Sequence, residues 1–151
     1  MTYNYSLLSI AATWAISMGV HGYAVYVVRT SGVKIRYDNA NPRNQWDRLK
    51  AKLPAEAYAR SERAQAASAN GLEVLGLWGL AVIAANVTKV PVSTLNKHSL
   101  FFIASRILYS ILYCNISTLR SSPARSIVWL AGIATAMRLL WKASSMLQLH
   151  I

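Results

Sequence analysis

The sequence predicts an all-α integral membrane protein, a four-helix bundle whose helices cross a bilayer. Of its 151 residues, 54% are hydrophobic and 14% are charged, whereas an ordinary soluble domain has about 25% charged residues. The apolar residues gather in four long runs, and roughly 20 such residues span the hydrocarbon core. This composition argues against a soluble enzyme and against disorder, which needs low hydrophobicity and high charge.

The first run predicts a span at about residues 5–28, because it contains no Asp, Glu, Lys or Arg. The alternative, a cleaved signal peptide, would have a positively charged start and a shorter apolar core, so we predict a retained helix. Three further spans are expected at about 60–88, 98–120 and 125–149. The charges inside their apolar runs are Glu73, then Arg106, then Arg138 and Lys142.

Prolines separate the runs, as expected of residues that interrupt helices: Pro42, Pro54, Pro91 and Pro123. We therefore predict one domain covering residues 1–151, with one long and two short connections. The long connection contains an Asn-Pro turn within Asp38–Arg43, and Trp46–Arg63 is expected to lead as a helix into the second span.

The basic residues predict the orientation, because Lys and Arg concentrate on the cytoplasmic side of membrane proteins. The third connection adds Arg120 and Arg125, and the opposite side has only Lys89 and Lys97 in its loop. We expect a multi-pass protein of the endoplasmic reticulum with luminal termini. The net charge of +11 is then a topology signal that also attracts membrane lipid, and no nucleic-acid partner is expected. Nine basic residues lie in the first connection: Arg29, Lys34, Arg36, Arg43, Arg48, Lys50, Lys52, Arg60 and Arg63.

Three sets of polar residues fall within or beside the spans, where charges are costly and usually face a bundle interior or a wet cavity. In the second span, Glu62, Asn70 and Glu73 share one helical stripe with Arg63 beside it. This set either binds a ligand or joins helices by hydrogen bonds.

The third span carries Arg106, Tyr109 and Tyr113 on one face, and we expect Arg106 to form a buried ion pair with Glu73. Arg120 follows Tyr113 by seven residues, so it shares that face if the helix continues. Arg120 and Arg125 either belong to the site or are interfacial anchors.

Together these residues predict a polar cleft that opens to the cytoplasm and suits a small anionic ligand, because Arg binds carboxylates bidentately. Glutathione has two carboxylates, an ammonium group and a thiol, and an Arg near that thiol would favour the reactive thiolate. No metal site is expected, since His21 has no second ligand at metal spacing and Cys114 is the single cysteine.

The chain resembles the MAPEG family, membrane-associated proteins in eicosanoid and glutathione metabolism, and looks closest to its fungal and bacterial-type members. The main signature is Glu62-Arg63, then Asn70, then Glu73. Supporting motifs are His21-Gly22-Tyr23-Ala24, Asp38-Asn39 with Asn41-Pro42-Arg43, Arg106 with Tyr109 and Tyr113, and Arg125-Ser126 with Trp129.

The resemblance implies a left-handed bundle assembled as a homotrimer, with cytoplasm-facing sites between subunits. Carried over, the glutathione-binding residues are Arg63, Asn70, Glu73, Arg106, Tyr109 and Tyr113, and the thiolate-stabilising residue is Arg120 or Arg125. Four positions depart from the pattern of the eicosanoid enzymes, namely Ala66, Ser68, Val74 and Gly76.

Three functions are compatible with this sequence. The first is a glutathione-dependent transferase or peroxidase that acts on a lipophilic electrophile or a lipid hydroperoxide. The second is a glutathione-independent isomerase or cyclase of a hydrophobic substrate on the same fold. The third is a non-catalytic membrane scaffold.

The predicted topology is tested by protease digestion of sealed microsomes. We expect cleavage in the Asp38–Arg43 connection and protection of a C-terminal tag, because the basic connection faces the cytoplasm. Protection of the connection together with cleavage of the tag would reverse the topology.

Overall fold

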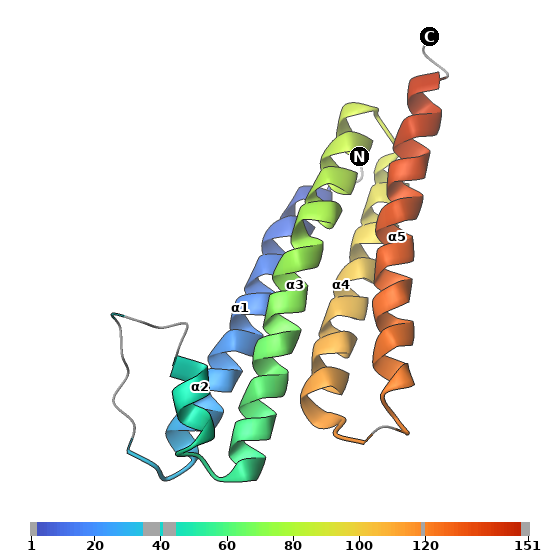
Figure 1. Ribbon diagram of the computed structural model, residues 1–151. Coiled ribbons are helices and arrows are strands. Elements are labelled where there is room, and N and C mark those ends of the chain that lie inside the picture. The colour runs from blue at the N-terminus through green and yellow to red at the C-terminus, as the bar shows by residue number, and fades with distance from the viewer. Residues whose placement is uncertain (1–2, 35–39, 41–44, 119, 149–151) are drawn as a thin grey trace.

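The computed structural model describes residues 3–34, 40, 45–118 and 120–148. Within them the chain is all-α, as predicted, with four long helices and one short one (Figure 1). The long helices are α1 (Ser6–Thr30), α3 (Ala55–Val87), α4 (Val92–Asn115) and α5 (Pro123–Gln148), and the short one is α2 (Gln45–Lys50). The turn predicted at Asp38–Arg43 lies outside the described residues, apart from Ala40.

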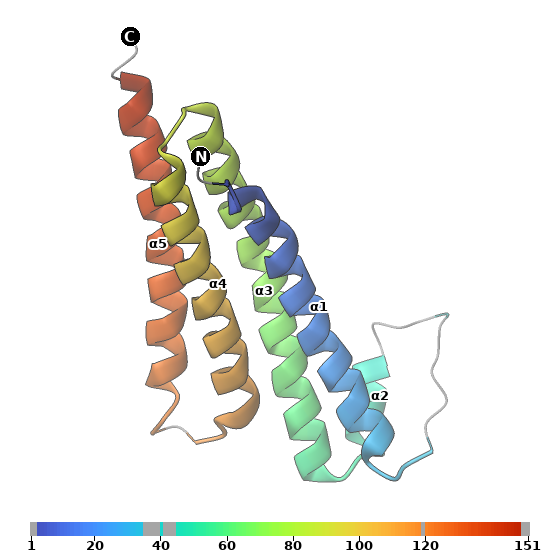
Figure 2. The same cartoon turned by 180° about the vertical axis from the view of Figure 1, so that it is seen from behind.

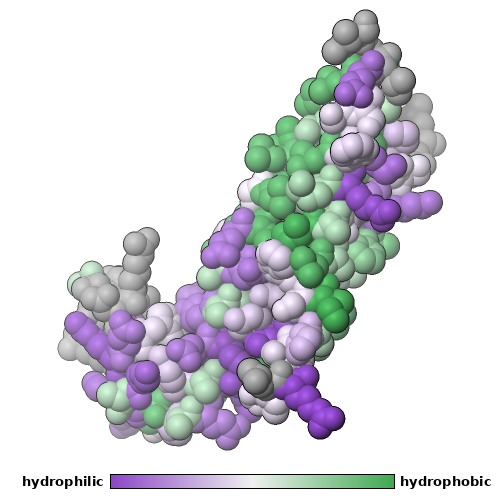
Figure 3. All heavy atoms as spheres, turned by 45° about the vertical axis from the view of Figure 1, so that its right-hand side comes forward, coloured by the Kyte–Doolittle hydropathy of each residue, from purple (hydrophilic) through white to green (hydrophobic). Residues whose placement is uncertain are grey.

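The long helices run antiparallel in chain order, so their connections alternate between the two ends of the molecule. The start of α1, the α3–α4 turn and the end of α5 lie at one end (Figures 1 and 2). Helix α2 and the α4–α5 turn lie at the other end, which we call the α2 end. Hydrophilic residues cover much of the α2 end, and an apolar surface extends over the bundle above it (Figure 3).

Among the described helices, α1, α3 and α5 are long and apolar enough to cross a membrane. Helix α4 has 24 residues but is not apolar enough by the same measure. Polar residues along the whole helix explain this: Asn96, Lys97 and His98 lie near its start, Arg106 lies in its middle, and Asn115 ends it. Three of the four predicted spans are therefore long and apolar enough to cross a membrane by themselves.

The bounds of α4 differ from the span predicted at 98–120. The helix begins directly after Pro91 and ends at Asn115. The Asn115 side-chain amide donates to the Ile111 carbonyl at 2.7 Å, and the backbone of Ile116 is extended. Asn, Ser and Thr offer the backbone such local alternatives to a helix. The expectation that this helix continues to Arg120 is therefore wrong.

Helix α3 is the centre of the bundle and packs against each of the other four helices. Its Trp78 is fully buried and stacks on Phe102 of α4, with the ring centroids 4.0 Å apart and the planes 5° from parallel. Ala81 and Val82 of α3 and Leu139 of α5 are buried in the same core. This core joins α3, α4 and α5 in the half of the bundle away from α2.

A stripe of small polar residues on α1 packs against α3, and it consists of Ser6, Ser9, Thr13 and Ser17. All four are buried, and three of them receive bonds from α3. The Trp78 indole donates to Ser9 Oγ at 2.9 Å, and the Asn86 amide donates to Ser6 Oγ at 3.0 Å. The Ser68 hydroxyl donates to the Ser17 carbonyl at 2.8 Å. Small residues let membrane helices approach closely, and polar bonds then join them.

The close α1–α3 approach predicts different effects of two glycine substitutions on α3. In Gly71→Ala, the new Cβ would lie 2.2 Å from Ser17 Oγ and 3.1 Å from its Cβ. Overpacking costs about 1–3 kcal/mol, which exceeds the gain in helix propensity of up to about 1 kcal/mol. We expect a lower free energy of unfolding in detergent micelles.

Gly79→Ala is the matched control, because its Cβ would meet only Ile10 Cγ2 at an ordinary 3.9 Å. This variant should be as stable as the parent chain or more so. Equal stability of the two variants would contradict the close packing at Gly71.

Candidate functional site

A groove between α3, α4 and α5 contains four of the predicted site residues. Its volume is about 340 Å³. It lies toward the α2 end, where α4 finishes and α5 begins. The lining residues are Asn70 of α3, Tyr109 and Tyr113 of α4, and Arg125, Ser126 and Trp129 of α5.

Arg106 lies behind this groove and is 2% exposed. Its Nη1 donates to Asn70 Oδ1 at 3.5 Å, and its Cζ lies 4.9 Å from the centroid of the Tyr109 ring. Its Nε and Nη2 are buried and have no hydrogen-bond partner. A Cβ at Gly132 of α5 would lie 2.8 Å from Nη2, so the glycine provides the space for this guanidinium.

The predicted ion pair between Glu73 and Arg106 does not form in this chain. Glu73 is exposed, whereas Arg106 is buried and bonds to Asn70 instead. Asn70 and Glu73 lie three residues apart, so their side chains point about 60° apart around α3, and Asn70 is the one that points toward Arg106. The Arg106 guanidinium is thus held by an amide oxygen and aromatic faces, and its charge is uncompensated by any carboxylate within 4 Å in the described chain.

The two arginines considered for the thiolate lie in different surroundings. Arg125 lines the groove, and its Cζ is 4.5 Å from the centroid of the Tyr113 ring. Arg120 is exposed in the turn before α5 and does not line the groove. A cation over an aromatic face is held in place by the ring quadrupole, so Arg125 has a defined position at the groove.

Arg63 lies apart from the groove lining. Its Nε donates to the carbonyl of Cys114 at 3.3 Å. That carbonyl belongs to the last turn of α4, where backbone carbonyls lack partners within the helix. Arg63 therefore caps α4 and joins its end to α3.

Two lining residues, Ser126 and Trp129, were not among the predicted site residues. The Trp129 Nε1 is buried without a hydrogen-bond partner. The sequence named both residues in a supporting family motif with Arg125 but gave them no role at the site, although Arg125 and Trp129, four residues apart, share one face of α5. The groove thus has more donors than the sequence assigned to it.

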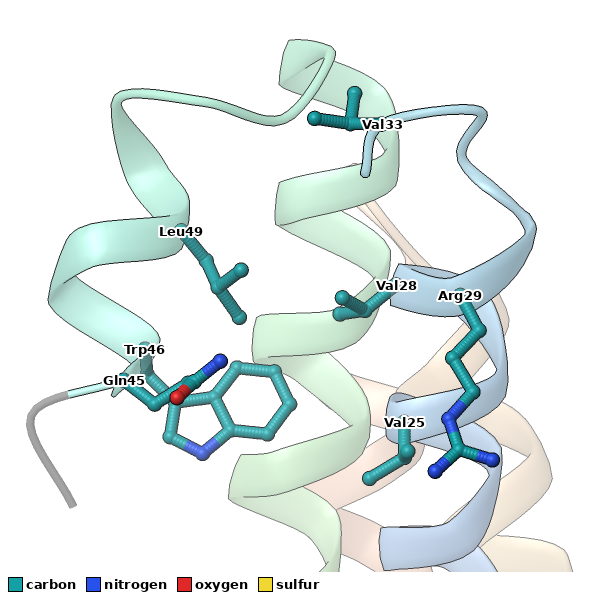
Figure 4. Close-up of a pocket in the computed structure, with 7 residues that line it drawn as sticks. All are labelled: Val25, Val28, Arg29, Val33, Gln45, Trp46 and Leu49. Carbon is teal, nitrogen blue, oxygen red and sulfur yellow. The ribbon is translucent and has the colours of Figure 1, made fainter. Parts of the chain in front are cut away.

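A second pocket of about 260 Å³ lies between α1 and α2 (Figure 4). Trp46 and Leu49 extend from α2 toward Val25 and Val28 of α1, and Arg29 lies on the same helix. Its walls are mainly apolar, with Arg29 and Gln45 as the polar lining residues, and it contains none of the predicted site residues. Across the described residues, no group of three His, Cys, Asp or Glu side chains is arranged to hold a metal ion.

Comparison with known protein families matches residues 7–145 to the MAPEG family. The chain belongs to the MAPEG family. It is therefore an integral membrane protein of a family associated with eicosanoid and glutathione metabolism, in agreement with its apolar helices. No curated protein and no solved structure matches the chain. The MAPEG match includes all of α3 and α4, nearly all of α1 and α5, and every residue that lines the groove.

The contact between Arg106 and Asn70 is tested by a double-mutant cycle with Arg106→Met and Asn70→Leu. Residues in contact couple by about 0.5–3 kcal/mol, so the two effects on the free energy of unfolding should not add. The control cycle pairs Arg106→Met with Glu73→Gln, and its effects should add within about 0.5 kcal/mol. Coupling to Glu73 and none to Asn70 would contradict the observed contact.

Proposed function

We propose that this MAPEG protein is a membrane glutathione transferase or peroxidase that acts on a lipophilic electrophile or a lipid hydroperoxide. One observation carries the proposal: the groove between α3, α4 and α5 is rich in hydrogen-bond donors and adjoins two cations without carboxylate partners. The two cations are Arg106 and Arg125. Such a site favours a ligand that brings its own negative charges.

Glutathione fits this donor set, because it is a small peptide with two carboxylates. A carboxylate near Asn70 and Tyr109 would compensate the Arg106 charge at short range. The Tyr113 hydroxyl and the Trp129 Nε1 provide further donors. Charge-assisted hydrogen bonds of this kind contribute about 1.5–3 kcal/mol each, so a few of them suffice for binding at cellular glutathione concentrations.

Arg125 is the residue we assign to the thiol. Its position over Tyr113 at the groove supports this role better than the exposed position of Arg120 does. A nearby guanidinium favours the thiolate, which is the nucleophilic form of sulfur. In the transferase reaction the thiolate sulfur forms a bond to the electrophilic carbon, and the leaving group departs with the bonding electrons.

A peroxidase reaction would begin from the same thiolate. The sulfur attacks the terminal oxygen of a lipid hydroperoxide, the O–O bond breaks, and a proton completes the lipid alcohol. A second glutathione then converts the sulfenic acid to a disulfide and water. In both reactions the arginine stabilises the thiolate before the attack.

The lipophilic substrate would enter from the bilayer. Ile127 and Leu130 flank the groove-lining residues of α5, and they are 65% and 56% exposed. Apolar side chains at this position would contact acyl chains on one side and the groove on the other. A substrate dissolved in the membrane would thus reach the thiolate without crossing water.

We also propose the homotrimer that the family resemblance implies, with its sites facing the cytoplasm of the endoplasmic reticulum. Exposed Glu73 supports an assembly, because it lies near the middle of α3. A charge at the bilayer centre costs about 2.5–3.5 kcal/mol or more, and a neighbouring copy would shield it from lipid. Packing of α4 against α1, α3 and α5 supports a transmembrane position for this more polar helix.

One observation favours the glutathione-independent isomerase or cyclase as the second candidate. Ser68 is one of the positions that depart from the pattern of the eicosanoid enzymes, which have a His or Gln there, and here it is buried and bonds to the Ser17 carbonyl. It is therefore not available to a ligand. Absence of glutathione binding in detergent would favour this candidate.

The role of Arg125 is tested by the ultraviolet absorbance of the thiolate on mixing protein with glutathione. Arg125→Leu should abolish the thiolate signal and leave most glutathione binding, because Arg106, Asn70 and the tyrosines remain. Arg120→Leu is the matched control and should change little. Loss of the signal in Arg120→Leu alone would contradict the assignment, and no signal in the parent protein would refute the transferase.

A further inference from the structure

A second cationic pocket lies in the half of the bundle away from the groove, between the first half of α4 and the middle of α5. Its volume is about 190 Å³. It is lined by Lys97, His98 and Phe101 of α4 and by Thr135 and Arg138 of α5. The proposed function gives no role to these residues.

The cations of this pocket have no acidic partner near them. All five Asp and Glu residues of the sequence lie between positions 38 and 73, whereas seven Lys and Arg residues follow Glu73. In the part of the chain that the structure describes, neither Lys97 nor Arg138 has a carboxylate within 4 Å. Since every copy of the chain has the same distribution, an oligomer would not supply a carboxylate at this end either. The two cations are therefore open to an anion from another molecule.

Two other polar side chains of the pocket, His98 and Thr135, already have hydrogen-bond partners within their own helices. His98 Nδ1 donates to the Thr94 carbonyl at 2.8 Å, and the Thr135 hydroxyl donates to the Ala131 carbonyl at 2.8 Å. The free donors are thus chiefly the Lys97 ammonium and the Arg138 guanidinium, both exposed. A guanidinium binds phosphate oxygens bidentately, and an ammonium adds a point charge.

The height of the pocket matches that of a lipid headgroup. Lys97 lies 18 residues before the end of α4, or about 27 Å along the helix, and the hydrocarbon core is about 30 Å thick. Leu100, Phe101 and Trp141 are 74%, 54% and 76% exposed beside the cations. These apolar side chains suit acyl chains, which a free phosphate ion does not have.

We propose that the pocket of Lys97, His98 and Arg138 binds the phosphate of an anionic phospholipid, whose acyl chains lie along the exposed apolar side chains of α4 and α5. The lipid neutralises the two cations and holds the outer ends of the two helices together. The inference does not depend on the proposed reaction. In the predicted topology the lipid belongs to the luminal leaflet.

Native mass spectrometry of the detergent-solubilised protein tests the proposal, with equimolar dioleoyl phosphatidylglycerol and dioleoyl phosphatidylcholine as the probes. We expect the parent protein to retain phosphatidylglycerol at least about fivefold better, since each basic residue contributes about this factor to the binding of anionic lipid. The double variant Lys97→Gln, Arg138→Gln should retain the two lipids about equally. Each single variant should retain phosphatidylglycerol over phosphatidylcholine by a ratio between those of the parent and the double variant. The single variants therefore still test the proposal if the double variant does not fold.

Lys142→Gln is the matched control, because it removes one cation a single turn from Arg138 without changing the lining of the pocket. Its lipid preference should equal that of the parent. No preference in the parent, or an equal loss in Lys142→Gln and Lys97→Gln, would overturn the proposal in favour of diffuse charge. Displacement of the lipid by inorganic phosphate at a similar concentration would also overturn it, because the site would then bind a free ion.

Discussion

The structure around the groove depends on one constraint, which is that a guanidinium without a carboxylate partner is buried among three helices. Arg106 projects from α4, bonds to Asn70 of α3 and lies against the space left by Gly132 of α5. Burying an unpaired charge costs free energy, so polar and aromatic groups around it must offset part of that cost. The amide oxygen and the faces of Phe102 and Tyr109 provide it here. These contacts fix the relative positions of α3, α4 and α5, and therefore the shape of the groove.

The bundle divides its tasks between two sides of α3. On one side, α1 packs closely through small hydroxyl-bearing residues whose bonds are satisfied within the protein. On the other side, α4 and α5 carry the buried guanidinium and the unpartnered indole Nε1 of Trp129. Within the described residues, α1 contacts α3 and α4 but not α5. The close packing of α1 on α3 supports the fold. The side of α3 that faces α4 and α5 has unsatisfied donors, so it is the side that can bind a ligand.

Much of this arrangement was predictable from local patterns. Apolar runs separated by prolines predicted the four long helices, and helical spacing correctly grouped Tyr109 with Tyr113 on the face of α4 that lines the groove. The partner of Arg106 was not predictable in the same way. Charge complementarity favoured Glu73, but the rotation of α3 within the bundle turns Asn70 toward α4. Gly71, about 100° around α3 from Asn70, packs closely against Ser17 of α1, and this tertiary contact is not visible in the sequence pattern.

The end of α4 shows a second limit of sequence patterns. Hydropathy alone extends the span to Arg120, whereas side-chain bonding by Asn115 ends the helix earlier and leaves Arg120 in an exposed turn. The choice between Arg120 and Arg125 depended on this boundary. Sequence periodicity assumes a continuous helix, so it could not separate the two arginines.

The central claim is that uncompensated cations at the groove bind the carboxylates of glutathione. Calorimetric titration of the detergent-solubilised protein with glutathione, and with its diester in which both carboxylates are blocked, tests this claim most directly. We expect glutathione to bind and the diester to bind at least about tenfold more weakly, since losing a charge-assisted hydrogen bond costs about 1.5–3 kcal/mol. Equal affinity for the two compounds would contradict the account.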